Sequence, residues 1–314
     1  MHPTASRTRL GLALGSGAAR GLAHIGVLKV LEDAEIPIDI ITGTSMGAFI
    51  GAMYAAGVPV AEMERAALEI DWIKMAKLLD PVLPTSGLTD SNKLVAFMAQ
   101  LLPVRDFDDL HHPFAVTATD INTGEAIIIK QGDLLEALRA SLAFPGIFSP
   151  VRFGQRFLVD GGLCKPIPTD VARHLGADKI IGVCTIPKIA KQTPETFLPA
   201  THGSSEAVSR WRDFFSPRRI EQAFRSALGQ EADNEMANNR KTPNIFRVCA
   251  QSVAIMENVI NDLHLHQNPH DLIIRPQLDG VTLLEFNRAA EIIAAGESSA
   301  KAALPDIHYL LQNA

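Results

Sequence analysis

The chain has 314 residues, of which 47% are hydrophobic and 20% are charged, a balance typical of a folded protein with a sizeable core. Its formal net charge of −6 argues against a general nucleic-acid binder, so no nucleic-acid partner is expected. The three cysteines, Cys164, Cys184 and Cys249, are widely spaced and odd in number. They fit neither a disulfide framework nor a zinc site, and they favour a reducing compartment.

The N-terminal region contains a short apolar run, Leu10 to Leu14, after Arg7 and Arg9. This run breaks into glycines too soon for a secretory signal, and no apolar stretch of the sequence is long enough to span a bilayer. We therefore expect a cytoplasmic protein that can touch the inner face of the membrane peripherally.

Strand-like and helix-like runs alternate at the start of the chain. Residues 10–14 (LGLAL) predict a buried strand, and the helical spacing that follows stops before Pro37. A second strand is predicted over 38–42 and a small-residue helix over 46–56. This alternation predicts an α/β fold with a mostly parallel central sheet and helices on both faces.

The rest of the chain continues the alternation less regularly. Residues 60–110 have helical character. Further strands are predicted over 114–119, 126–129, 156–159, 179–185 and 272–274. A capping box of Thr282 and Glu285 predicts a final helix that Gly296 closes. No repeat or convincing boundary divides the sequence, which predicts one domain over 1–314, with a core of about 8–186 plus 245–296. The polar, proline-containing stretch 188–245 is expected to be a variable cap or insertion.

Ser45 lies in the sequence Gly43-Thr44-Ser45-Met46-Gly47, between a predicted strand and a predicted helix. A sharp turn of this G-x-S-x-G type exposes a serine hydroxyl as a nucleophile and needs small flanking residues. Taken alone, the motif is equally consistent with a tight turn in which Ser45 caps the helix.

A second glycine loop, GSGAARG, follows the first predicted strand and spans Gly15 to Gly21. It could be a dinucleotide fingerprint, but the acidic residue that grips a ribose is missing from the end of the second strand. Its other interpretation is an oxyanion hole, formed around Gly17 and Ala18, with Arg20 bracing the loop or facing a substrate phosphate.

The base that activates Ser45 has several candidates in the sequence. Asp160 ends a strand-like run and is followed by Gly161 and Gly162, which would let other backbone come close. Burial would raise the pKa of such a carboxylate and make it a useful base. An ordinary Asp-Gly turn is the competing interpretation. Late histidines could also serve: His264, His266, His270 and His308. His24 is more readily explained as a buried core residue.

Taken together, GSGAARG, GTSMG and DGG resemble the patatin-like phospholipase family, particularly its bacterial members and the neuropathy target esterase branch. The resemblance covers about residues 10–185, with a further patch near 270–296. It implies a three-layer α/β/α sandwich and a Ser45–Asp160 dyad without histidine. It also implies an oxyanion hole formed by Gly15, Ser16, Gly17, Ala18 and Arg20.

The resemblance further implies hydrolysis of acyl esters in phospholipids or lysophospholipids, with no metal and no cofactor. Ser16 and Ala18 depart from an all-glycine loop, which would cost about 1 kcal/mol wherever a positive φ is needed. Two apolar or aromatic-basic segments could contact a membrane, Trp72–Leu83 and Trp211–Arg219, although either could instead pack on the core. The alternative function is a regulatory protein-binding member of the same fold with little or no hydrolase activity.

Overall fold

The computed structural model describes residues 7–70, 91–186, 245–268 and 270–313. The chain divides into two units, one formed by Met1–Pro187 with Met256–Ala314 and the other by Lys188–Ile255. The predicted variable cap, 188–245, lies almost wholly outside the described residues, as do both predicted membrane-contact segments, Trp72–Leu83 and Trp211–Arg219. The single-domain organisation therefore stays a prediction.

The first unit contains an eight-stranded sheet. Seven strands follow the order β5-β6-β3-β2-β1-β7-β8, and the eighth, β4, pairs with β3. The strands are β1 (Leu10–Leu14), β2 (Ile40–Thr44), β3 (Phe114–Asp120), β4 (Ala126–Ile129), β5 (Val151–Phe153), β6 (Arg156–Asp160), β7 (Lys179–Val183) and β8 (Leu272–Ile274). The central run β3-β2-β1-β7-β8 is parallel, and β4 and β6 both pair with β3 in the antiparallel sense. The mostly parallel sheet expected from the sequence is confirmed.

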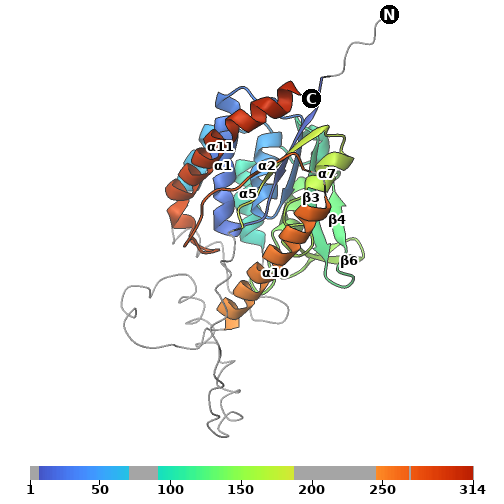
Figure 1. Ribbon diagram of the computed structural model, residues 1–314. Coiled ribbons are helices and arrows are strands. Elements are labelled where there is room, and N and C mark those ends of the chain that lie inside the picture. The colour runs from blue at the N-terminus through green and yellow to red at the C-terminus, as the bar shows by residue number, and fades with distance from the viewer. Residues whose placement is uncertain (1–6, 71–90, 187–244, 269, 314) are drawn as a thin grey trace, which may run out of the picture. The chain divides into compact units, whose positions relative to one another are not determined.

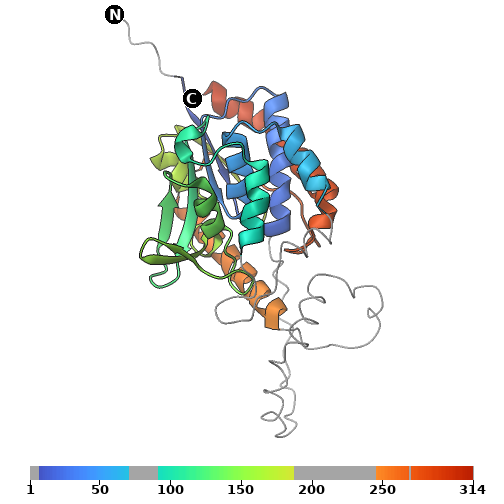
Figure 2. The ribbon, with the colours of Figure 1, turned by 180° about the vertical axis from the view of Figure 1, so that it is seen from behind.

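Helices cover both faces of this sheet (Figures 1 and 2). The helices are α1 (Ala23–Asp33), α2 (Met46–Ala55), α3 (Val60–Leu68), α5 (Asn92–Leu101), α6 (Leu134–Ser141), α7 (Thr169–His174), α10 (Ile245–Gln267) and α11 (Ala289–Gln312). Short 3₁₀ turns, η1 (Ala18–Leu22), η2 (Phe107–Asp109), η3 (Gly161–Leu163) and η4 (Phe286–Arg288), connect them. The α/β/α layering agrees with the predicted fold class.

The two faces of β1 show how the layers are packed. All five residues of β1 are buried, as expected for a parallel strand covered on both sides. Leu14 lies close to Gly51 of α2 on one face. On the other face, Ala13 packs in a cluster with Ile167 and Cys184, and Leu265 of α10 contacts this cluster.

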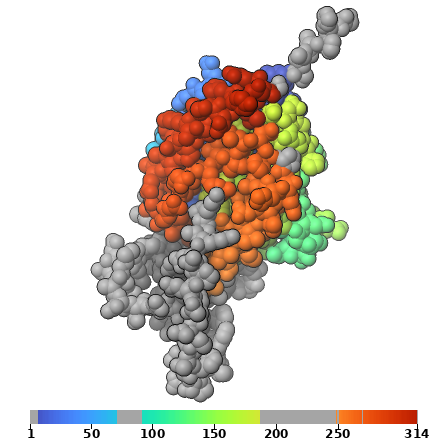
Figure 3. Space-filling view, in the orientation of Figure 1, coloured from blue at the N-terminus to red at the C-terminus, as the bar shows by residue number. Residues whose placement is uncertain are grey.

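α1 and α11 pack with their backbones in close contact, which requires glycine on both helices. A Cβ atom at Gly296 would lie 2.0 Å from the carbonyl oxygen of Ala23, and one at Gly26 would lie 2.0 Å from that of Ile293. The prediction that Gly296 ends the last helix is wrong, since α11 continues to Gln312. Gly296 allows α11 to approach the backbone of α1 and does not end the helix. α11 and α10 both contribute to the face seen in Figure 3.

Among the described residues, none of the helices combines the length and the apolar character needed to cross a membrane.

Candidate active site

Ser45 forms the sharp turn between β2 and α2. Its backbone has φ 55° and ψ −123°, a conformation that L residues rarely adopt and that costs about 1–3 kcal/mol. The turn needs glycine on both sides: a Cβ at Gly43 would lie 2.4 Å from Cα of Ala48, and one at Gly47 would lie 2.3 Å from the carbonyl oxygen of Leu14. The Ser45 N–H donates to the buried Ser141 hydroxyl at 2.8 Å. The close packing around Gly43 and Gly47 and the hydrogen bond to Ser141 thus hold the strained backbone of Ser45 in place.

Asp160 is the hydrogen-bond partner of the Ser45 side chain. The Ser45 Oγ donates to Asp160 Oδ2 at 2.6 Å, and the Gly162 N–H donates to Asp160 Oδ1 at 2.8 Å. Asp160 is 2% exposed, and this burial raises the pKa of its carboxyl group to about 6, although both hydrogen bonds oppose the shift. A carboxylate with that pKa is mostly ionised at neutral pH and still basic enough to accept a proton.

The sheet brings Ser45 and Asp160 together in a way that the sequence did not indicate. β6 is antiparallel to β3 and is separated from β2 by β3, so β2 and β6 are not adjacent strands. Asp160 of β6 is paired in register with Ala118 of β3, and Thr44 of β2 is paired with the preceding residue, Thr117. The two strand ends therefore meet across the carboxyl-terminal part of β3.

The first glycine loop lies against this turn, because a Cβ at Gly47 would also come within 2.4 Å of the Gly15 carbonyl oxygen. The amides of Gly15 and Ser16 are occupied, donating to the carbonyl oxygens of Val183 at 3.0 Å and Pro166 at 2.8 Å. In the described part of the chain, the amides of Gly17 and Ala18 donate no hydrogen bond to a protein acceptor. Of these four amides, those of Gly17 and Ala18 are therefore the two left without a hydrogen-bond acceptor.

The conformation of the loop explains its composition. A Cβ at Gly17 would lie 2.1 Å from Thr185 Oγ1, which itself donates to the Ser16 carbonyl oxygen at 2.6 Å. Ala18 has a φ of 50°, so the departure from glycine at this position does place a side chain in the left-handed region. The loop therefore contains one strained backbone position, at Ala18.

Two basic side chains behind the loop are buried. The Nε2 of His24 bonds to the Gly15 carbonyl oxygen at 2.8 Å, and full burial lowers the pKa of this ring to about 4. His24 is thus neutral and structural, in agreement with its interpretation as a core residue. Arg20 is only 6% exposed and its Nε lacks a hydrogen-bond partner among the described residues. Burial lowers the pKa of Arg20, while the nearby Glu257 opposes this shift.

Among the described residues, the Ser45 hydroxyl is hydrogen-bonded to Asp160 and to none of the late histidines. His264 bonds to the Asn268 side chain at 2.8 Å, and His270 bonds to the Asn268 carbonyl oxygen at 3.3 Å. No group of three or more His, Cys, Asp or Glu side chains within the described ranges is arranged to hold a metal ion.

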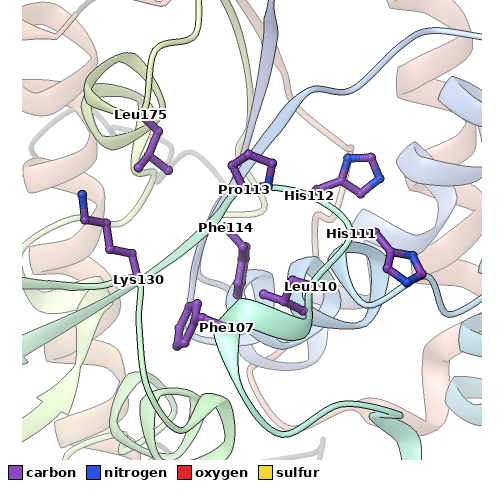
Figure 4. Close-up of a pocket in the computed structure, with 8 residues that line it drawn as sticks. All are labelled: Phe107, Leu110, His111, His112, Pro113, Phe114, Lys130 and Leu175. Carbon is purple, nitrogen blue, oxygen red and sulfur yellow. The ribbon is translucent and has the colours of Figure 1, made fainter.

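A cavity of about 350 Å³ lies elsewhere, at the amino-terminal end of β3 (Figure 4). It is lined by Phe107, Leu110, His111, His112, Pro113, Phe114, Lys130 and Leu175. Since parallel strands place Ser45 at their opposite ends, this cavity is not part of the candidate active site.

Three residues that contact the site carried no assigned role in the sequence. Ser141 holds the Ser45 amide, Thr185 shapes the glycine loop, and Glu257 of α10 accepts a hydrogen bond from Ser16 Oγ at 3.4 Å. Residues 137–151 (ALRASLAFPGIFSPV), which include Ser141, also resemble the patatin-like phospholipase family, and this resemblance is the one signal that the sequence offers for Ser141. Thr185 and Glu257 are brought in by tertiary structure alone.

Comparison with known proteins shows the family of the chain. The family model for patatin-like phospholipases matches residues 12–173, and the chain belongs to that family. A Mycobacterium tuberculosis protein, named as an uncharacterized NTE family protein, is 29% identical over 95% of this chain and 92% of its own length.

Two longer relatives resemble the chain through one part of their length. The lysophospholipase nte1 of Aspergillus fumigatus is 29% identical over 93% of this chain, and human patatin-like phospholipase domain-containing protein 6 is 35% identical over the same share. The chain spans 18% of the first and 20% of the second.

Proposed function

We propose that this protein is a serine lipid acyl hydrolase that uses Ser45 and Asp160 as a dyad. The observation that supports it most strongly is the 2.6 Å hydrogen bond from Ser45 Oγ to the buried Asp160 carboxylate. Ser45 lies on a strained turn beside a loop with two unengaged amides, which is the arrangement that nucleophilic acyl transfer requires.

In the proposed reaction, Ser45 Oγ attacks the acyl carbonyl carbon while Asp160 takes its proton. The amides of Gly17 and Ala18 donate hydrogen bonds to the oxyanion of the tetrahedral intermediate, each worth about 3 kcal/mol of barrier. Asp160 then gives the proton to the departing alkoxide, which leaves as an alcohol, and the acyl group remains on Ser45. Water attacks this ester in the second half, with Asp160 again the base, and the fatty acid is released.

The proposed substrates are phospholipids or lysophospholipids, cut at a carboxylic ester. The family membership and the name of the Aspergillus relative support this substrate class. A lipid substrate also requires contact with a membrane surface or micelle. We propose that this contact is peripheral, at the inner face of the membrane, and that Trp72–Leu83 or Trp211–Arg219 provides it, on the strength of their sequence alone.

The test compares release of fatty acid from lysophosphatidylcholine, and of p-nitrophenol from a short-chain ester, by wild type and Ser45→Ala. The matched control is Ser298→Ala, which changes an exposed serine of α11. We expect Ser45→Ala to lose roughly 1,000-fold or more in kcat and the control to lose nothing. Equal rates for wild type and Ser45→Ala would refute the proposal and favour a regulatory binding protein.

A further inference from the structure

α10 places a second buried acid at the candidate active site. Glu257 is 4% exposed, although glutamate is rarely buried so deeply without a charged partner bonded to it. Its Oε1 accepts a hydrogen bond from Ser16 Oγ at 3.4 Å, which connects the helix to the first glycine loop. The acid therefore lies in the interior of the first unit, where its charge state affects its neighbours strongly.

The position of Gly162 shows how closely Glu257 approaches the dyad. The point where a Cβ of Gly162 would lie is 2.2 Å from Glu257 Oε1 and 3.2 Å from Asp160 Oδ1. The same point is 3.1 Å from Ser16 Oγ. Three oxygen atoms, from the helix, the Asp160 turn and the first loop, thus converge over one glycine. A side chain at position 162 would displace the Glu257 carboxyl group.

The charged and polar groups that act on Glu257 come from β6 and from the first glycine loop with η1. Burial is the main cause that raises the pKa of Glu257 to about 8, and the negative charge of Asp160 on β6 adds to it. Arg20 on η1 and the Ser16 hydroxyl act in the opposite direction. At neutral pH Asp160 is therefore mostly ionised, whereas Glu257 is mostly protonated.

We propose that Glu257 is a positioning residue of the hydrolase site: its uncharged carboxyl group joins the oxyanion loop to the Asp160 turn, and its ionisation lowers activity by placing a second negative charge beside the dyad. This inference rests on the proposed function. Ionisation releases one proton to solvent and leaves a carboxylate near the place where the oxyanion must form. Like charge there raises the energy of the tetrahedral intermediate.

The test measures kcat/KM from pH 5 to pH 9.5, with spontaneous hydrolysis subtracted, on a neutral p-nitrophenyl ester. Wild type should lose roughly tenfold between pH 7 and pH 9, as Glu257 ionises with a pKa of about 8. Glu257→Gln keeps an acceptor for Ser16 but cannot ionise, so its profile should lack this alkaline limb. Its loss of kcat should also be smaller than that of Glu257→Ala, which removes the contact.

Two further variants make the result specific. Asp262→Asn changes an exposed carboxylate on the same helix and should keep the alkaline limb of wild type. Ser16→Gly removes the hydrogen bond that lowers the pKa of Glu257, so the limb should move to higher pH. This second shift can be measured even if the Glu257 variants do not fold.

The inference is overturned if Glu257→Gln shows the same alkaline limb as wild type, or if Ser16→Gly leaves the limb in place or moves it to lower pH. Either result would leave Ser45-dependent hydrolysis intact, so the proposed function would stand. A failure of the proposed function looks different, because Ser45→Ala would then match wild type at every pH.

Discussion

The strained backbone at Ser45 leads to a prediction in which a glycine makes the protein more stable. The φ of 55° and ψ of −123° cost about 1–3 kcal/mol for an L residue, and glycine largely avoids this cost. Glycine also gives the unfolded chain more conformational freedom, which costs about 0.5–1 kcal/mol. The difference predicts that Ser45→Gly is more stable than Ser45→Ala by about 1 kcal/mol. Both variants lose the same hydrogen bond to Asp160, so the comparison isolates the backbone.

The assay is thermal and urea unfolding of the two variants side by side at pH 7. A difference of 1 kcal/mol should raise the Tm of Ser45→Gly about 2–4 °C above that of Ser45→Ala. The matched pair is Ser298→Gly and Ser298→Ala in the helix α11, where the order should be reversed because glycine is about 1 kcal/mol worse than alanine. If Ser45→Ala proved equal to or more stable than Ser45→Gly, the argument that this turn stores strain would be refuted.

Three other outcomes are expected. The kcat/KM of wild type should rise roughly tenfold from pH 5 to pH 7 as Asp160 ionises with a pKa of about 6; a profile that stays flat down to pH 4 would exclude Asp160 as the base. Gly296→Ala should lower the free energy of unfolding by about 1–3 kcal/mol, because its Cβ meets the Ala23 carbonyl oxygen; the stabilisation usual for alanine within a helix would contradict this packing. The pKa of Glu257 is raised in the folded state, so the stability that this acid contributes is lost as pH rises toward 8. The pKa of His24 is lowered in the folded state, so the stability that this ring contributes is lost in the opposite direction, as pH falls below about 6.5. From pH 6.5 to pH 8 wild type should therefore lose about 2 kcal/mol of unfolding free energy relative to Glu257→Gln, and parallel curves for the two proteins would contradict the buried acid.

The sequence predicted those parts of the fold that depend on local pattern. The strands at 10–14, 126–129 and 272–274 have the predicted limits, because each is a short apolar run between breaking residues. The strand Val151–Phe153 was not predicted, since Arg152 interrupts its apolar residues. The end of α11 was misplaced because a glycine used for helix contact looks the same in sequence as one used to end a helix.

The residues of the candidate site that have a local sequence pattern could also be predicted, and those that depend on tertiary structure could not. Ser45 and the first glycine loop could be found because each turn needs particular residues next to one another in sequence. Asp160 could be named but not placed, because the antiparallel direction of β6 has no local signal. Glu257 could not be found at all: its burial depends on α10 packing over Gly162, nearly a hundred residues earlier in the chain.

The central claim, that the Ser45 hydroxyl is a nucleophile activated by Asp160, is tested most directly by a fluorophosphonate probe, with the modified residue located by mass spectrometry. The account predicts a single adduct on Ser45 in wild type, none in Ser45→Ala, and much slower labelling of Asp160→Asn although it remains folded. A folded wild type that takes up no probe, or that carries it on a different residue, would contradict the account.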